Sequence, residues 1–306
     1  MAITISGGVQ LSGPVLLDPT GGSPSPTPSG GFQGSNYGYA TGAPLAPQSQ
    51  IDKFPFSSDS NSTDVGELSQ SRGQSAGQSS SASGYTSGGA SPSTTNIIDK
   101  FSFSSDGNAT DVGDLSVARY SVAGQSSTAS GYTSGGIVSA FSNIIDKFSF
   151  STDGNASDVG DLTETRGRVA GQSSTENGYT SGKGTVIDKF SFSTDGNASD
   201  VGDLTVSRQS VMGQSSSASG YTSGGDGGGN VIDKFPFSSD NNATDVGDLT
   251  VSRNAGAGQS SIASGYTSGG NPSSNVIDKF PFASDSNATD VGDLATSKPD
   301  CAGQQY

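Results

Sequence analysis

An acidic turn that recurs along the chain carries residue types able to bind a metal ion. In one copy the oxygen-bearing side chains belong to Asp106, Asn108, Thr110, Asp111 and Asp114. Carboxylate, amide and hydroxyl oxygens are ligands that Ca²⁺ accepts at such spacing. The same side chains also cap the backbone amides of their own turns. We expect the capping role here, with no bound metal and no other cofactor.

Residues suited to catalysis are scarce. The sequence contains no histidine, so the commonest general base and metal ligand is missing. The single cysteine, Cys301, has neither a histidine to activate its thiolate nor a second cysteine for a disulfide. We therefore expect no enzymatic activity.

A basic residue recurs at one equivalent site in every repeat. The residues at that site are Arg72, Arg119, Arg166, Arg208, Arg253 and Lys298. Such repetition indicates a structural role, because a catalytic site draws unlike residues from different repeats. We expect each basic side chain to pair with the acid equivalent to Asp114.

All these residues belong to a unit that occurs six times. The word Ile-Asp-Lys-Phe begins at Ile51, Ile98, Ile145, Ile187, Ile232 and Ile277. A second word, Asp-Val-Gly-(Asp/Glu)-Leu, follows each copy, for example at residues 111–115. Steps of 42 to 47 residues between copies are typical of propeller blades.

The first and last units are complementary. The first begins in mid-unit with the degenerate segment 38–42, and the last stops after Ala302-Gly303-Gln304. The C-terminal segment therefore supplies the strand that the first unit lacks. The sequence predicts an all-β fold, a six-bladed β-propeller over residues 37–306 closed by N- and C-terminal parts of one blade. A linear solenoid or fibre of the six units is the alternative architecture.

Four short strands are expected in each unit. In one unit they cover residues 123–127, 131–134, 143–150 and 158–162. The small residues of the first two strands suit a crowded ring centre, and Phe and Ile of the third suit the wider space between blades. The residue between the two Phe is proline at Pro55, Pro236 and Pro281. We expect a strand end or bulge there, because proline cannot donate to a ladder.

Residues 1–36 are predicted to form an extended N-terminal arm. Two short extended candidates contain Ile3 and Ile5, and Val15, Leu16 and Leu17. A linker rich in proline and glycine follows at residues 19–31. The arm is expected to attach the protein to a partner by adding a strand. A disordered tail is the alternative.

The sequence motifs of the repeat resemble those of known families. Segment 106–119, followed by Ala123-Gly124 and Gly135-Gly136, resembles the Kelch repeat, which implies four-stranded propeller blades. Asp111 stands where Kelch repeats carry a tryptophan, and this chain has none. The histidine ligands of the copper-dependent Kelch oxidases are also missing. The turn 104–110 is similar to the Asp-box of sialidases, which is a structural turn in that family.

The Ile-Asp-Lys-Phe and Gly-Tyr-Thr-Ser-Gly-Gly wording resembles that of repeat proteins in marine, cyanophage-type bacteriophage virions. This resemblance implies a virion structural or appendage protein, such as a tail fibre, tail-associated or head-decoration component. It would be made in the host cytoplasm, reside in the virion as an oligomer and bind other virion proteins through its arm. A secreted or cell-surface propeller that binds or cleaves glycans is the alternative.

The charge pattern limits the possible partners further. The net charge is -15 and the acids are distributed evenly over the repeats. This disfavours nucleic acid, which requires clustered Lys and Arg. No apolar run is long enough to span a membrane. The first residues lack the basic and apolar regions of a signal peptide.

The repeats differ mainly in two classes of loop that a four-stranded blade places on one face of the ring. One class joins the second and third strands, and the other joins consecutive blades. Divergence confined to one face indicates an asymmetric contact, with a host-surface glycan or protein as a possible partner. Drift in tolerant loops is the alternative. The predicted partner-binding residues are Leu45, Ile137, Val138, Phe141, Arg168, Lys183 and Asp226.

Overall fold

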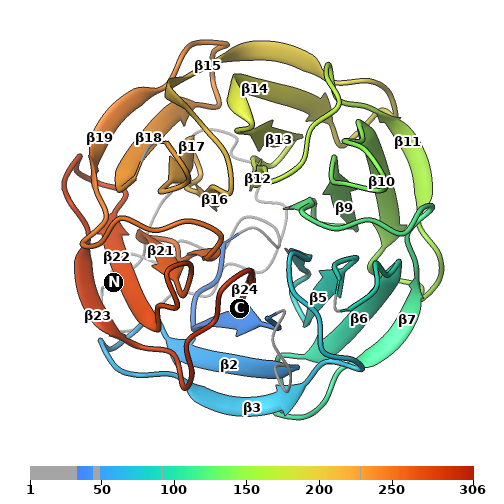
Figure 1. Ribbon diagram of the computed structural model, residues 1–306, viewed down its shortest axis with the longest axis horizontal. Coiled ribbons are helices and arrows are strands. Elements are labelled where there is room, and N and C mark those ends of the chain that lie inside the picture. Colours follow the sequence, from blue (N-terminus) through green and yellow to red (C-terminus); the bar gives the residue numbers. More distant parts are fainter. Residues whose placement is uncertain (1–32, 44–48, 91, 228) are drawn as a thin grey trace, which may run out of the picture.

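The computed structural model describes residues 33–43, 49–90, 92–227 and 229–306. Every regular secondary-structure element in these ranges is a β-strand, and the strands form six four-stranded antiparallel sheets. The sheets are arranged as blades around a central axis (Figure 1). The predicted six-bladed β-propeller is thus confirmed. None of the described ranges contains a helix that could cross a membrane.

Each blade has two inner strands near the axis. The innermost strands are β24 (Ala302–Gln305), β4 (Ala76–Ser79), β8 (Ala123–Ser126), β12 (Ala170–Ser173), β16 (Met212–Ser215) and β20 (Ala257–Ser260). The second strands are β1 (Tyr37–Thr41), β5 (Ser83–Ser87), β9 (Ser130–Ser134), β13 (Asn177–Ser181), β17 (Ser219–Ser223) and β21 (Ser264–Ser268).

Two further strands complete each blade toward the outside. The third strands are β2 (Gln50–Pro55), β6 (Ile97–Ser102), β10 (Ile144–Ser149), β14 (Gly184–Ser191), β18 (Val231–Pro236) and β22 (Val276–Pro281). The outermost strands are β3 (Thr63–Glu67), β7 (Thr110–Asp114), β11 (Ser157–Asp161), β15 (Ser199–Arg208), β19 (Thr244–Asp248) and β23 (Thr289–Asp293). We number the blade containing β1 as blade 1 and the others in chain order.

The ring closes within blade 1, as expected. β24 pairs with β1 so that Tyr39 lies opposite Gln304. The inner strands also contact one another in a circle, β24 lying between β4 and β20. A closed circle excludes the linear stack. The proline between the two Phe marks the end of β2, β18 and β22, which confirms the expected strand end. The bulge lies elsewhere, between Ile98 and Asp99 in blade 2.

The chain enters the ring on the face that carries the turns between first and second strands. The Gly34 amide donates to the Ser260 carbonyl at 2.8 Å, and the Asn36 amide donates to Tyr306 at 2.6 Å. Residues 33–36 of the predicted arm therefore contact blades 6 and 1. The other arm residues named above lie outside the described residues, namely Ile3, Ile5, Val15, Leu16 and Leu17.

The apolar core is divided among the six joints between blades. At the joint of blades 2 and 3, Tyr85, Ile98 and Leu115 pack against Phe148, with Phe150 beside them. The Tyr85 and Phe150 rings stack with centroids 4.8 Å apart. Equivalent residues form the same cluster at the other five joints. Each blade thus buries one face against each neighbour, which explains why a single unit has too small a core to fold alone.

Glycine at the ring centre allows the inner strands to approach closely. A Cβ atom on Gly124 would lie 2.2 Å from the Gly77 carbonyl oxygen of the preceding blade. The Gln78 amide then joins two blades, donating to the Tyr132 carbonyl at 2.9 Å and to Thr133 Oγ1 at 3.0 Å. The axial space at this level is only about 40 Å³, enough for water alone.

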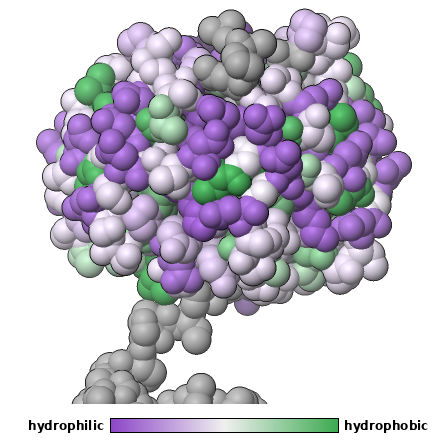
Figure 2. Space-filling view, turned by 90° about the horizontal axis from the view of Figure 1, so that it is seen from below, coloured by the Kyte–Doolittle hydropathy of each residue, from purple (hydrophilic) through white to green (hydrophobic). Residues whose placement is uncertain are grey.

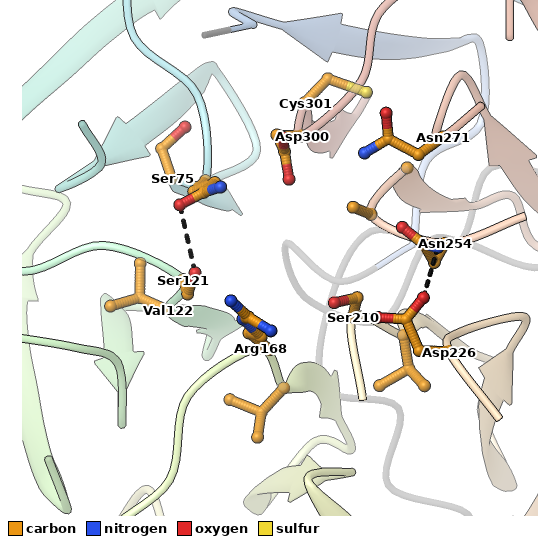
Figure 3. A pocket seen from close by; sticks show the side chains of 15 residues that line it. Ser75, Ser121, Val122, Arg168, Ser210, Asp226, Asn254, Asn271, Asp300 and Cys301 are labelled. Atoms are coloured by element: carbon orange, nitrogen blue, oxygen red, sulfur yellow. Dashed lines mark hydrogen bonds between the residues drawn. The ribbon is translucent and has the colours of Figure 1, made fainter. Parts of the chain in front are cut away.

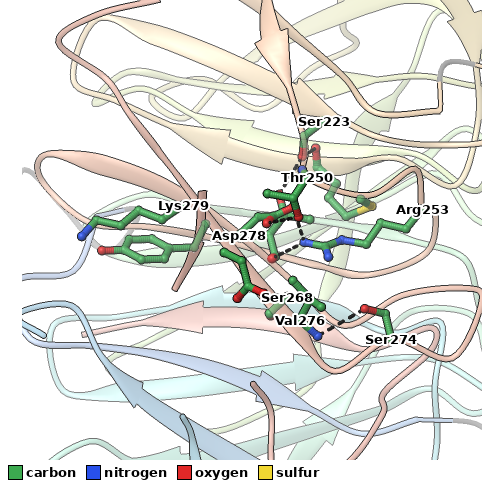
Figure 4. A network of polar contacts seen from close by, with 12 residues as sticks. Ser223, Thr250, Arg253, Ser268, Ser274, Val276, Asp278 and Lys279 are labelled. Carbon is green, nitrogen blue, oxygen red and sulfur yellow. Dashed lines mark hydrogen bonds and ion pairs between the residues drawn. The ribbon is translucent and has the colours of Figure 1, made fainter. Parts of the chain in front are cut away.

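Buried ion pairs link the blades, but not with the partner expected from the sequence. Arg119 follows blade 2 and pairs at 2.7 Å with Asp146 of blade 3, both side chains being fully buried. The expected pairing with Asp114 is wrong because Asp114 lies on the outermost strand, whereas the arginine reaches between the blades. Figure 4 shows the joint of blades 5 and 6, where Arg253 and Thr250 both contact Asp278.

Candidate functional site

Both variable loop classes lie on one face of the disc, opposite the face by which the chain enters. We call this the variable face; it comprises the connections between second and third strands and those between blades. The exposed large hydrophobic residues of the described chain all lie in these connections or in the end of β15. They are Val117, Val138, Phe141, Val206 and Val251. By contrast, the side of the disc is mostly hydrophilic (Figure 2).

One loop of the variable face carries the predicted apolar cluster. The Ile137 amide donates to the Tyr120 carbonyl at 2.8 Å, which fixes the base of the loop. Val138 and Phe141 remain 43% and 39% exposed. Lys183 from the next blade places its ammonium 4.9 Å from the Phe141 ring centroid. The structure thus brings together two of the predicted site residues, Phe141 and Lys183. Leu45 lies outside the described residues.

Six equivalent residues form a hydrogen-bonded rim around the axis on this face. Each lies two positions after the basic residue that recurs in every unit, and each has a left-handed backbone conformation with φ between 53° and 61°. Each amide donates to the carbonyl of its counterpart in the preceding blade, at 2.6 to 2.8 Å, and the circle is complete. The rim residues are Gln74, Ser121, Arg168, Ser210, Ala255 and Asp300.

The rim surrounds a cavity of about 280 Å³, which we call the axial bowl (Figure 3). Its wall below the rim is apolar on one half, where Val122, Val169 and Val211 are adjacent, and contains Ser75 and Cys301 on the other. The tightly packed inner strands described above close its floor. The bowl is therefore a single-ended pocket that opens on the variable face.

Charged residues of opposite sign line the bowl. Arg168 stands third around the rim and Asp300 sixth, so the two lie across the axis from each other. Burial raises the pKa of Asp300. Hydrogen bonds from the Gln74 and Asn271 side chains and the positive charge of Arg168 reduce this rise. At the mouth of the bowl, outside the circle of rim residues, Asp226 accepts a hydrogen bond from Asn254 at 2.5 Å. The predicted residues Arg168 and Asp226 thus belong to one pocket.

Sequence reasoning missed Asp300 and Gln74, although a signal for them was present. The position two residues after the basic residue reads Gln, Ser, Arg, Ser, Ala and Asp in successive units. An aligned comparison of the units would have shown this variation between the basic residue two positions before and the Gly-Gln pair three positions after, which recur in every unit. That these positions meet around one pocket is visible only in the folded ring.

The acidic turns lie on the opposite face and make structural contacts. Asp106 pairs with Lys53 of the preceding blade at 2.9 Å. Asn108 accepts the Glu67 amide at 3.1 Å, and Asp111 accepts the Gly113 amide at 3.1 Å. The capping interpretation is confirmed for Asp111. It is wrong for Asp106, which pairs with a lysine, and Asn108 caps the neighbouring blade rather than its own turn. Within the described ranges no three His, Cys, Asp or Glu side chains gather as a metal site.

Comparisons with known proteins support the fold alone. No protein-family model and no curated protein matches the chain. A solved structure titled "Structure of YjhT" is similar with a TM-score of 0.64 and 11% identity, over 76% of this chain and 86% of that one. Because 350 chains of solved structures match, the architecture does not indicate one function.

Proposed function

We propose that this chain is a non-catalytic binding propeller of a bacteriophage particle. It is attached through its N-terminal residues and presents its variable face to a partner. The resemblance of the repeat wording to marine bacteriophage virion proteins supports the particle as its location.

The observation that carries this proposal is the distribution of exposed apolar residues. Val138 and Phe141 share one loop of the variable face, and the other large exposed hydrophobics lie on the same face. Apolar groups gathered on one surface of a hydrophilic protein are typical of interaction sites. An aromatic ring beside a lysine, as in Phe141 and Lys183, is a suitable anchor for a partner.

The placement of the chain entry supports attachment from the other side. Residues 33–36 reach the ring on the face of the acidic turns, next to blades 6 and 1. An arm attached to other virion proteins there leaves the variable face free for a host-surface protein or glycan. The protein serves as a tail fibre, tail-associated or head-decoration component, present in several copies per particle.

The proposed absence of catalysis rests on how the charged groups are used. Five of the six arginines, all except Arg168, are buried in ion pairs at the joints, where substrate has no access. The sequence has no histidine to act as a general base. We therefore expect no hydrolysis of glycans or peptides by the parent protein or by variants at Asp300 or Cys301.

The variable face is tested by a triple substitution, Ile137→Ser, Val138→Ser and Phe141→Ser. Ala82→Ser combined with Ala129→Ser, on the exposed turns of the opposite face, is the matched control. We expect both proteins to melt at the same temperature, because the equivalent loops of other blades lack this apolar cluster. The triple variant should lose incorporation into particles or capture of host cells. Equal incorporation and capture by both variants would show that the loops differ by drift alone.

The location is tested directly. Peptides of this chain should be detected by mass spectrometry in gradient-purified particles, and an antibody to the propeller should label them in electron micrographs. Detection only in the culture medium or on the host surface would favour the second candidate, a glycan-binding or glycan-cleaving propeller. The polar axial bowl, lined by Arg168, Asp226 and Asn254, is the observation in favour of that candidate.

A further inference from the structure

We infer that the axial bowl binds a small zwitterion of the amino-acid or dipeptide class. In this arrangement Arg168 holds the carboxylate, and Asp300 with the side-chain oxygen of Asn271 holds the ammonium group. This inference does not depend on the proposed location in a particle, because the bowl is complete in the isolated chain.

The bowl is preorganised by its backbone. Its rim residues are held by the circle of amide–carbonyl hydrogen bonds, at 2.6 to 2.8 Å, that runs through all six blades. Each rim residue also has a left-handed backbone conformation. A rim fixed in this way loses little conformational entropy when a ligand enters, which favours binding of small molecules.

The composition of the rim is asymmetric within a symmetric frame. Every unit has a buried basic residue two positions before the rim residue and Gly-Gln three positions after it, while the positions between vary. At the rim itself the only charged residues are Arg168 and Asp300, which lie across the axis. A purely structural position would need no such charges, since Ser121, Ser210 and Ala255 make the same backbone hydrogen bonds.

The two charged sides suit the two ends of a zwitterion. A planar guanidinium binds a carboxylate through two parallel hydrogen bonds. Across the axis, the Asp300 carboxylate lies beside the Asn271 amide, whose side-chain oxygen is a further acceptor (Figure 3). Asp226, whose backbone pairs with Gln209 beside Ser210, accepts a hydrogen bond from Asn254 at 2.5 Å and is a second carboxylate at the edge of the bowl.

The dimensions limit the ligand to a small molecule. Residues joined by one backbone hydrogen bond are about 5 Å apart, so a six-membered rim is about 10 Å across. The bowl enclosed by this rim has a volume of about 280 Å³, which has room for an amino acid or a dipeptide. The adjacent Val122, Val169 and Val211 provide an apolar wall for an aliphatic side chain.

The test uses three related probes, glycyl-L-leucine, N-acetyl-glycyl-L-leucine and glycyl-L-leucinamide. The second lacks the ammonium group and the third lacks the carboxylate. Isothermal titration at pH 7 should give the unblocked dipeptide an affinity at least tenfold higher than that of either blocked probe. Equal affinities for all three, or no binding of the unblocked dipeptide at millimolar concentration, would overturn the inference.

Variants taken from the ring itself identify the two charged contacts. Arg168→Ser and Asp300→Ala introduce residues that other units carry at the same position, so the rim should remain intact and the melting temperature unchanged. Arg168→Ser should remove the preference over the amide probe, and Asp300→Ala the preference over the acetylated probe. Val138→Ser, outside the bowl, is the control and should bind like the parent. Parental preferences in both rim variants would refute the assignment.

Particle incorporation distinguishes this inference from the proposed function. The triple variant at Ile137, Val138 and Phe141 should lose incorporation while keeping dipeptide binding. Asp300→Ala should bind the unblocked dipeptide at least tenfold more weakly than the parent while keeping incorporation. Failure of either activity therefore counts against one proposal without affecting the other.

Discussion

The joint that closes the ring should be the weakest of the six, and a single substitution should strengthen it. At the joint of blades 2 and 3, Arg119 contacts Asp146 at 2.7 Å and also donates to the Thr133 carbonyl at 2.8 Å. At the closing joint the equivalent residue is Lys298, whose ammonium lies 3.8 Å from Asp52. Burial raises the pKa of Asp52 and lowers that of Lys298, as expected for a buried and poorly matched pair.

The gain expected from Lys298→Arg follows from this comparison. An arginine with the geometry of Arg119 adds a short charge-assisted hydrogen bond to Asp52, worth about 1.5 to 3 kcal/mol. For a ring of about 270 residues, the entropy of unfolding is about 0.6 kcal/mol/K, so 2 kcal/mol raises the melting temperature by about 3 °C. The lysine already donates to the Gln50 carbonyl at 3.3 Å, and loss of this contact reduces the gain.

The assay is thermal unfolding by calorimetry and circular dichroism at pH 7. Arg119→Lys is the reciprocal variant and should lower the melting temperature by a similar amount, since it creates a second joint of the closing type. Ala295→Thr should add a smaller increment, because Thr250 at the equivalent place donates to Asp278 at 2.6 Å. If Lys298→Arg fails to raise the melting temperature while Arg119→Lys lowers it, the closing joint is not limited by its ion pair.

Three further predictions concern the ring closure, the acidic turns and the cysteine. Removing residues 299–306 deletes β24 and exposes the edge of β1, so unfolding should lose cooperativity; an unchanged melting curve would contradict closure through β24. Chelation with EDTA should leave the melting temperature unchanged because the Asp106 and Asn108 oxygens bind Lys53 and a backbone amide; a drop restored by Ca²⁺ would show a bound ion. Burial raises the pKa of Cys301 from 9.0 to about 12, so the unfolded thiol ionises before the native one and stability should fall between those two pH values. Iodoacetamide at pH 8.5 should accordingly modify Cys301 only in denaturant, and rapid modification of the native protein would show that β24 opens.

Much of the fold follows from the period and wording of the repeats. The recurrence of Ile-Asp-Lys-Phe marks the third strand of every blade, and its Phe lies over a glycine of the second strand. In blade 3 a Cβ on Gly131 would lie 2.3 Å from the Phe148 ring, which explains why the Gly-Tyr-Thr-Ser segment begins with glycine. Local patterns of this kind are readable because both partners belong to one unit.

The variable face was also predictable, because loop order along an antiparallel blade decides which connections share a face. Its apolar loop is recognisable from Ile137, Val138 and Phe141, whose residue types differ from those of the equivalent loops. The contact of Phe141 with Lys183 was not predictable, because it depends on how two blades pack. The role of these residues in binding a partner stays a prediction.

By itself, the sequence determined the number of blades, the placement of small and aromatic residues within them, and closure by complementary ends. These properties depend on the period of the repeat and on the hydrophobicity of each position. The tertiary structure alone decided which groups meet across the joints and the axis. Arg119 reaches Asp146 in the next blade, and Arg168 comes to face Asp300, because the chain travels once around a circle. Closing that circle places the third and sixth units opposite each other, a relation that no spacing along the chain expresses.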